Sequence, residues 1–150
     1  MRIRDVFKKR SSALNFREDF EMNDIDFSSI FELARYSPSI YNTQGVRYLC
    51  IQDKSSKGKL KELNLGQHKI STASGIILVL HTQDFLGESN TDKIYRPAVQ
   101  LGMMSEEDLS MTKEQLKKLE ENYTEEELKE EMYRNTYVNV GMLISICTVL

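Results

Sequence analysis

The stretch Ser37-Pro38-Ser39-Ile40-Tyr41-Asn42-Thr43-Gln44 is the most informative part of this 150-residue chain. It follows a segment with helical periodicity and precedes a strand-like segment. Pro38 is expected to end the helix, because the residue before a proline is pushed out of the α region. The Pro-Ser turn exposes backbone groups that can lie over a flat ring, and the amides of Asn42 and Gln44 offer both donors and acceptors. The alternative is a helix-ending turn closed by Asx-type hydrogen bonds.

A second short run, Arg10-Ser11-Ser12, follows an amphipathic helix predicted from the start of the chain to about Lys9. A guanidinium can grip a phosphate through two hydrogen bonds, and two hydroxyls with adjacent backbone N–H groups complete an anion cradle. Residues 1–17 hold six Arg and Lys residues against Asp5 alone, a charge that would steer an anion towards this end. The alternative is a solvated helix end, since such short runs are common.

The rest of the pattern predicts an α/β or α+β core in a single domain of residues 1–150. Periodicity predicts a helix over 27–36 with Asp26 as N-cap, and an exposed, Lys-rich helix over 54–63. Strands are predicted over 47–51 and over 75–80, the second buried on both faces, and 87–92 is interpreted as a loop. Two helices are predicted in the acidic segment 105–134, joined near Asn122-Tyr123, because Thr112/Gln115 and Thr124/Glu127 have capping-box spacing. Residues 137–150 are predicted to form a helix that is apolar almost all round and therefore buried in a core or an interface.

Composition excludes several classes of protein. The formal net charge of -3 argues against a general nucleic-acid binder. Neither a signal-peptide core nor an apolar run of membrane-spanning length is present, so a cytoplasmic location without membrane contact is the expectation. Cys50 and Cys147 lie in apolar surroundings and are expected to be buried and reduced. The sequence has no Cys/His cluster, so no metal site is predicted.

Lys9-Arg10-Ser11-Ser12-Ala13-Leu14-Asn15-Phe16, taken with the loop at 37–44, resembles the nitroreductase family. The resemblance implies an α+β sandwich with a central sheet flanked by helices, and FMN as cofactor. It implies that Arg10, Ser11 and Ser12 contact the ribityl phosphate, and that Ser39, Ile40, Asn42 and Gln44 contact the isoalloxazine held mainly by the other subunit of a homodimer. Three positions depart from the family pattern: Leu14 replaces a basic residue, and Gly45-Val46 replaces Pro followed by an aromatic residue.

The resemblance also covers Gly66 to Ser74, where Lys69 is the candidate for a charge near the pyrimidine end of the flavin. A surface lysine is the alternative. No catalytic acid or base is implied, because the cofactor carries the reaction. The acidic excursion 105–134 is interpreted either as a lid or dimer arm or as a solvated hairpin. Tyr95, Tyr123 and Tyr133 are possible ring-stacking residues, and the spacing selects none of them.

The predicted function is FMN-dependent transfer of electrons from NAD(P)H to a small-molecule acceptor, a nitroaromatic, quinone or similar compound. The alternative is a non-catalytic, truncated module that dimerises through the apolar segment 135–150 and binds flavin weakly or not at all. A dehalogenating or flavin-handling relative is a third possibility, since fold does not fix reaction. The chain is interpreted as C-terminally incomplete, because further strands, a Gly-containing flavin loop and basic phosphate ligands follow this segment in the family.

Overall fold

The computed structural model describes residues 2–150, so that Met1 and the side chain of Ile3, both assigned to the first helix by the sequence, lie outside the described part. The chain has an α+β architecture of one small sheet and seven α-helices within the described residues. The elements in order are α1 (Ile3–Lys9), α2 (Asp24–Ala34), a 3₁₀ turn (Ile40–Asn42), β1 (Val46–Ile51), α3 (Lys54–Leu63), α4 (His68–Thr72), β2 (Ile76–His81), α5 (Glu88–Gln100), α6 (Glu106–Glu121) and α7 (Glu125–Val149).

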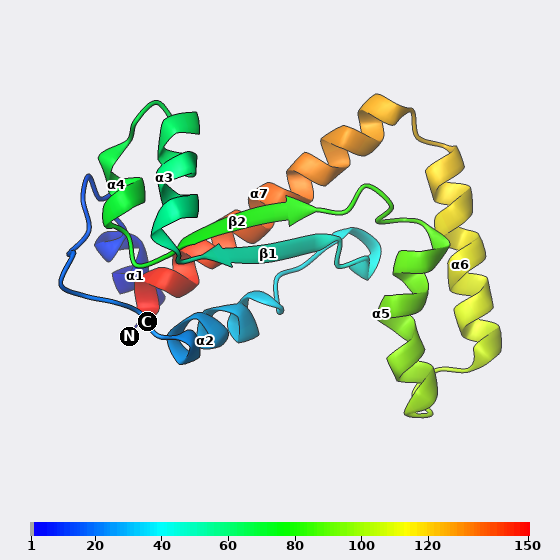
Figure 1. Cartoon of the computed structure of the whole chain (residues 1–150). Helices are drawn as coiled ribbons and strands as arrows, with labels where there is room; N and C mark the ends of the chain where they lie inside the picture. The colour runs from blue at the N-terminus through cyan, green and yellow to red at the C-terminus, as the bar shows by residue number, and fades with distance from the viewer. Residues whose placement is uncertain (1) are drawn as a thin grey trace. The chain divides into compact units, whose positions relative to one another are not determined.

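Contacts divide the chain into two compact units. The first unit comprises residues 1–37, 48–79 and 140–150, and the second comprises 38–47 and 80–139. Strands β1 and β2 pair in a two-stranded sheet and run in opposite directions (Figure 1). Both strands and α7 contribute residues to each unit.

The first unit is built on a core between α2, α7 and one face of the sheet. Phe27, Ile30 and Ala34 recur on one side of α2 and are buried with Leu143 of α7. Alternate strand residues pack against them because successive side chains of a strand point to opposite faces; these are Tyr48 and Cys50 of β1 and Ile77 and Val79 of β2. The ring of Phe31 stacks on Tyr48 with centroids 5.8 Å apart. Burial of this apolar face is what holds the helices on the sheet.

Strand β2 differs from its prediction. Its residues are half-buried rather than buried on both faces, and Leu80 is exposed, because β2 pairs with β1 alone among the described residues and only one face meets the core. The bounds of the strands and of α3 otherwise follow the periodicity closely. The exposed character predicted for α3 is wrong at one position, since Lys57 is buried at 7% exposure.

Helix α2 begins earlier than predicted. Its N-cap is Asn23, whose Oδ1 accepts hydrogen bonds from the N–H groups of Ile25 and Asp26. Asp26, predicted as the cap, instead lies at the third helical position and accepts a bond from the N–H of Asn23. The pair forms a reciprocal capping box, in which two free backbone donors are satisfied at once. The helix ends at Ala34, before Pro38 is reached.

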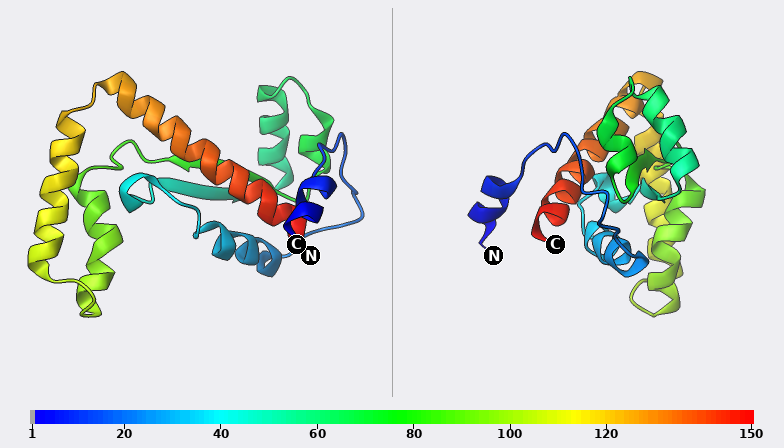
Figure 2. Two further views of the ribbon diagram at one scale, coloured as in Figure 1. Left: turned by 180° about the vertical axis from the view of Figure 1, so that it is seen from behind. Right: turned by 60° about the vertical axis from the view of Figure 1, so that its left-hand side comes forward.

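The second unit contains α5 and α6 packed as an antiparallel pair (Figures 1 and 2). Its core consists of Phe85, Leu86 and Leu116, with side chains of α6 and α7 around them. The loop predicted for 87–92 is wrong: α5 begins at Glu88, with Gly87 as N-cap and with Asn90 and Thr91 buried. The turn-like residue types there are overridden by tertiary contacts.

The two predicted acidic helices exist, with one cap assigned correctly. Thr124 and Glu127 form the predicted box at the start of α7, and α6 ends at Glu121. Thr112 lies inside α6 rather than at its start, where Ser105 is the N-cap and bonds the N–H of Asp108. The predicted apolar helix is not a separate element, because α7 continues without a break from Glu125 to Val149.

Helix α7 leaves a row of apolar side chains exposed in the chain. These are Tyr133, Tyr137, Val138, Met142, Ile144 and Val149. Cys147 is also exposed, contrary to prediction, because Leu143 and Ile146 take the side of the helix that meets the core. Cys50 is half-buried against that core. Within residues 2–150, no helix combines the length and apolar character that crossing a bilayer requires.

Candidate functional site

The loop of residues 38–44, in the second unit, has an unusual backbone. Tyr41, Asn42 and Gln44 all have positive φ, at 47°, 53° and 45°. Only Asn among them adopts this left-handed region readily, and a non-glycine residue there costs roughly 1–2 kcal/mol. Such a conformation persists only where surrounding contacts over-determine it, and these are frequent at functional sites.

Two asparagines of α7 hold the start of the loop. Asn135 Oδ1 accepts a 2.7 Å hydrogen bond from the N–H of Ile40, while its Nδ2 donates to the carbonyl of Glu131. One turn further on, Asn139 Nδ2 donates to the carbonyl of Asn135 at 2.9 Å and approaches the carbonyl of Pro38 at 3.5 Å. Both side chains are buried, with 7% and 5% exposure. Water therefore cannot replace these bonds cheaply.

The end of the loop is held by α5. Asn90 Nδ2 donates to the carbonyls of Thr43 and Phe85, at 2.8 and 3.0 Å, and Asn90 itself accepts a bond from Arg47. Thr43 is 2% exposed and closes the 3₁₀ turn through its hydroxyl. Arg47 also donates to the carbonyl of Gln44. The backbone on both sides of the exposed residues is thus fixed.

A tyrosine of α5 and a tyrosine beside α7 lie against this loop. The Tyr95 hydroxyl donates to the carbonyl of Tyr41 at 3.2 Å. Tyr123 packs against the same core as Ile40, and desolvation raises its pKa, with a further contribution from Tyr41. Of the three tyrosines that the sequence offered for ring stacking, Tyr95 and Tyr123 are the two placed beside the loop by these contacts.

The predicted cofactor residues of the loop differ in the hydrogen-bonding groups that they leave available. Ile40 packs its side chain into the core, its N–H bonds Asn135, and its carbonyl accepts from Thr43. Its remaining means of contacting a ring is apolar. Ser39 Oγ accepts from the N–H of Gln44, which leaves the hydroxyl proton to donate elsewhere. The exposed amides of Asn42 and Gln44 share a 3.3 Å bond and keep further donors and acceptors.

The residues predicted for the phosphate lie in the first unit. Arg10 is the C-cap of α1 and, with Ser11 and Ser12, is exposed. Arg10 lines a cavity of about 310 Å³ with Val6 and Phe7 of α1 and with Ile144 and Thr148 of α7. Arg10 therefore lies beside a mostly apolar surface at the end of α7. Figure 2 shows α1 beside this end of the helix.

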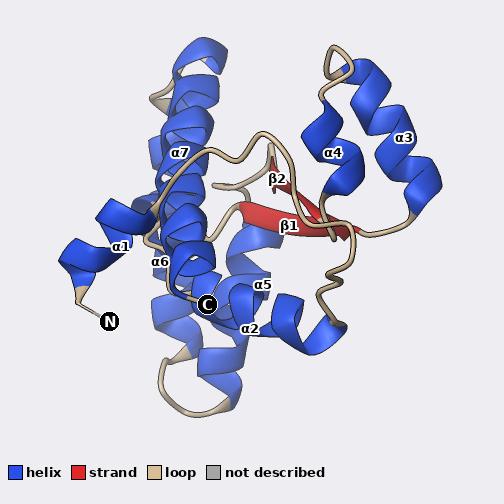
Figure 3. Ribbon diagram, turned by 90° about the vertical axis from the view of Figure 1, so that its left-hand side faces the viewer, coloured by secondary structure: helices blue, strands red, loops and turns tan. Residues whose placement is uncertain are grey.

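Lys69, also in the first unit, lies half-buried on the short helix α4. The chain after Ser12 is tied to this helix by two hydrogen bonds: Asn15 Oδ1 with His68 Nδ1 at 3.0 Å, and the N–H of Phe16 with Thr72 Oγ1 at 3.1 Å. The segment that follows the Arg10 run thus runs along the helix that carries Lys69. Figure 3 shows α4 beside α3.

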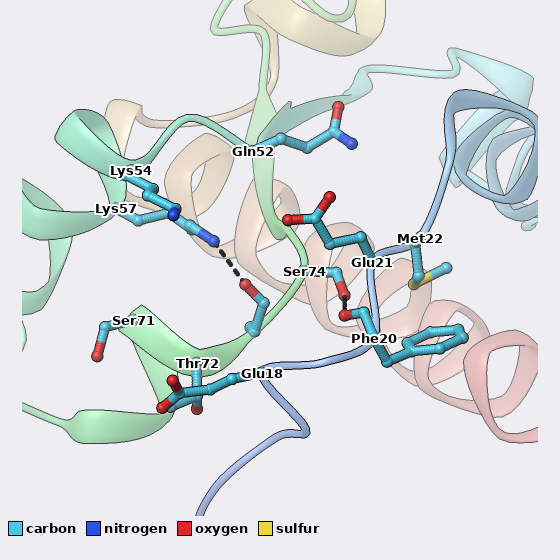
Figure 4. A pocket seen from close by; sticks show the side chains of 11 residues that line it. Glu18, Phe20, Glu21, Met22, Gln52, Lys54, Lys57, Ser71, Thr72 and Ser74 are labelled. Atoms are coloured by element: carbon cyan, nitrogen blue, oxygen red, sulfur yellow. Dashed lines mark hydrogen bonds between the residues drawn. The ribbon is translucent and has the colours of Figure 1, made fainter.

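Helix α4 is fixed from its other side as well. Lys57 Nζ donates at 2.7 Å to the carbonyl of Ala73, the residue that ends α4, and a cation there is favourable because helix carbonyls are unpaired at that end. Ser74 Oγ donates to the carbonyl of Phe20 (Figure 4). These residues line a cavity of about 340 Å³ with Glu18 and Glu21. The hydrogen bond to the end of α4 accounts for the buried position of the Lys57 side chain.

The predicted site residues therefore fall into two groups. Arg10, Ser11, Ser12 and Lys69 belong to the first unit, and the loop residues Ser39, Ile40, Asn42 and Gln44 to the second. The sequence reasoning missed Asn90, Asn135 and Asn139. Their only signal in the sequence is that each is a polar residue on an otherwise apolar or amphipathic helix face. This signal becomes meaningful only once their hydrogen-bond partners, up to 101 positions away in the sequence, are known.

Solved structures define the class of fold. The Bacillus subtilis protein ydfN superposes with a TM-score of 0.88 at 25% identity, covering 97% of this chain and 70% of that one. A protein of Exiguobacterium sibiricum, solved in complex with FMN and described as a nitroreductase, also gives a TM-score of 0.88, at 22% identity, with 99% and 70% covered. The fold is the nitroreductase-like α+β fold, as the sequence predicted.

The family follows from the sequence comparison. The model of the nitroreductase family matches residues 7–145, and this chain belongs to that family. Among curated relatives, MhqN of Bacillus subtilis strain 168 is 28% identical over 139 residues, covering 93% of this chain and 66% of the relative. YdgI of the same strain is 30% identical over 146 residues, covering 95% and 65%. Both carry the name of an NAD(P)H nitroreductase. The chain spans about two thirds of the length of these relatives.

Proposed function

We propose that this chain carries the FMN-binding residues of an oxidoreductase that transfers electrons from NAD(P)H to a nitroaromatic, quinone or similar acceptor. The observation that carries the proposal is the loop of residues 38–44, strained yet held at both ends, with the half-buried Ser39 hydroxyl keeping its proton to donate and the amides of Asn42 and Gln44 exposed. Family membership and the names of the relatives support the same class of reaction. The nature of the acceptor and the choice of NADH or NADPH belong to the proposal.

The donor set fits FMN. In the proposal Arg10, Ser11 and Ser12 hold the phosphate, because an exposed guanidinium and two hydroxyls supply charge-assisted and neutral donors. Lys69 supplies a positive charge for the pyrimidine end of the ring. The chemistry that FMN supplies when bound is the transfer of hydride from NAD(P)H to the acceptor. The task of the protein is to bind and orient, so no side chain needs to act as acid or base.

The ring-side groups belong to the loop. Ser39 keeps a free hydroxyl proton, and the Asn42 and Gln44 amides can match the mixed donors and acceptors of the ring edge. Ile40 would add apolar contact. In a homodimer of the family type these residues serve the flavin held by the partner subunit. The exposed apolar row of α7 supports dimerisation, because a patch of this kind is normally covered.

The test is purification of the 150-residue chain without added flavin, followed by its visible spectrum and its mass in solution. A yellow dimer bleached by NAD(P)H supports the proposal. Arg10→Ala should weaken FMN binding about tenfold or more, the loss of a charge-assisted contact, whereas Arg17→Ala, which removes a basic residue paired with Asp19, should not. A dimer that stays colourless after FMN is added would favour the alternative, a dimerisation module without flavin.

A further inference from the structure

Side chains of α7 form hydrogen bonds with the backbone on either side of Ser39. We propose that Asn135 and Asn139 are positioning residues of the flavin site, which hold the loop of residues 38–44 in the conformation that presents its hydroxyl and amides to the ring. The inference rests on the proposed function, because it names what orients the ring-side half of that site. Neither asparagine is itself expected to touch the cofactor.

The orientation of the Asn135 amide is set by the helix. Its Nδ2 donates to the carbonyl of Glu131 at 2.8 Å, four residues earlier, and this leaves Oδ1 turned towards the loop. That oxygen receives the N–H of Ile40 at 2.7 Å. Because Asn135 is buried and Ile40 is half-buried, water replaces this acceptor poorly, so removal of Oδ1 disfavours the present position of Ile40.

Asn139 acts one turn along the same face of α7, since residues four apart in a helix lie above one another. Its Nδ2 spans the carbonyls of Asn135 and Pro38. The carbonyl of Pro38 and the N–H of Ile40 are thus both held, and Ser39 lies between them. The Ser39 hydroxyl, in turn, receives the N–H of Gln44. The hydrogen bonds made by α7 therefore constrain the backbone of the whole loop.

The consequence concerns the left-handed residues. Tyr41, Asn42 and Gln44 adopt a conformation that an unrestrained chain avoids. Without the bond to Ile40 the loop has a lower-energy alternative with ordinary φ values, in which the amides of Asn42 and Gln44 point elsewhere. The expected result is weaker flavin binding and an altered flavin absorption band, with the helices intact.

The experiment compares Asn135→Ala, Asn135→Asp and Thr136→Val in the 150-residue chain. The alanine removes both bonds of the amide, whereas the aspartate keeps the acceptor for Ile40 and loses only the donor to Glu131. Thr136→Val is the matched control, because it removes a bond to the carbonyl four residues earlier without reaching the loop. Three quantities are measured: FMN affinity by fluorescence titration, the absorption band of bound flavin, and hydrogen exchange of the Ile40 amide.

Asn135→Ala should weaken FMN binding about tenfold, the loss expected for one buried hydrogen bond, shift the flavin band and speed exchange at Ile40. Asn135→Asp should restore all three, and Thr136→Val should change none. Asn139→Ala, with its longer bond to the loop, should give a smaller effect in the same direction and serves as the second variant if Asn135→Ala is misfolded by circular dichroism.

Equal affinity and equal Ile40 exchange in Asn135→Ala and the unmodified chain would overturn the positioning role. So would an equal loss in Asn135→Ala, Asn135→Asp and Thr136→Val, since that is the mark of a general loss of helix stability. Failure of the proposed function is seen separately, as an unmodified chain that binds no FMN. Ile40 exchange then decides the positioning role: faster exchange in Asn135→Ala alone supports it, and unchanged exchange refutes it.

Discussion

Gly45 passes so close to His81 that a Cβ on the glycine would lie 2.4 Å from Cε1 of the imidazole and 2.9 Å from its Nε2. The same atom would lie 2.9 Å from Cβ of Phe85, whose ring meets the imidazole edge to face with centroids 5.2 Å apart. The Gly45 carbonyl also accepts a bond from the N–H of Thr82 at 2.9 Å. The loop is thus fastened to the end of β2 by a contact that only glycine permits.

Gly45→Ala should lower the free energy of unfolding by about 1–3 kcal/mol, the usual cost of overpacking a tight site. Urea denaturation measures it. Gly58→Ala is the matched control: Gly58 lies inside α3 with open space around it, so alanine there should be neutral or stabilise by up to roughly 1 kcal/mol. A Gly45→Ala variant as stable as the unmodified chain would show that His81 moves aside freely.

His81 should make stability depend on pH. Burial lowers its pKa below the usual 6.5, with an increase from the bond that Nδ1 donates to the Thr82 carbonyl and a further decrease from Arg47. Because the folded pKa is the lower one, the unfolded chain binds more protons below pH 6.5. The contribution of neutral His81 is therefore complete above that pH and is lost as the pH falls through the folded pKa.

Urea unfolding of the unmodified chain and of His81→Gln at pH 7.5 and pH 5 tests this. The difference in the free energy of unfolding should be smaller at pH 5, where protonation of unfolded His81 has reduced the advantage of the histidine. A difference that is equal at the two pH values would contradict the sign argued from burial.

Local pattern was enough to predict the strands, α1 and α3. Both strands are short, mostly apolar runs, apolar residues recur at helical spacing in α1, and Asp53, the N-cap of α3, lies directly before that helix. Helix α5 could not be predicted in the same way. Its first turn, Glu88-Ser89-Asn90-Thr91, has turn-like residue types, but in the fold Asn90 and Thr91 are buried and Asn90 donates to the distant carbonyl of Thr43.

The candidate site shows the same division. The residues of 37–44 and Arg10-Ser11-Ser12 could be selected by motif, because the resemblance lies within a few consecutive residues. The left-handed backbone could not be predicted, since neither Tyr41 nor Gln44 favours positive φ. That conformation depends on Asn135, 95 positions from its partner Ile40. Gly45, where the sequence departs from the family pattern, is packed tightly against His81, which the sequence alone does not show.

The pair of helices α5 and α6 should be sensitive to acid and to salt. Arg96 bonds Asp92 at 2.7 Å and Glu106 at 2.6 Å, and Lys113 bonds Asp92 at 2.8 Å. Hydrogen bonds from Arg96, and to a lesser extent from Lys113, lower the pKa of Asp92 to about 2 from its usual 3.8. Because the folded pKa is the lower one, this contribution is complete above pH 3.8 and is lost as the pH falls to about 2.

Arg96→Met should therefore lower the melting temperature at pH 7, and less so in 1 M salt, because salt screens partly exposed pairs. The difference from the unmodified chain should shrink between pH 4 and pH 2. Lys117→Met, on the exposed face of α6, is the control and should shift the melting temperature little at any pH. Equal loss at low and high salt would mean that Arg96 acts through packing of its methylene groups instead.

Lys57 should stabilise the first unit through one hydrogen bond. Its Nζ donates at 2.7 Å to the Ala73 carbonyl, which is the only hydrogen-bond partner of this side chain among residues 2–150, and the side chain is buried. Lys57→Met keeps the methylene packing and leaves that carbonyl without its donor. The free energy of unfolding should fall by about 1–3 kcal/mol. The Ala73 amide, which bonds the Lys69 carbonyl, should exchange faster because the end of α4 is released.

Lys59→Met, exposed on the same helix, should stay within about 0.5 kcal/mol of the unmodified chain. Equal effects at the two lysines would assign the loss to charge on α3 rather than to the bond with Ala73.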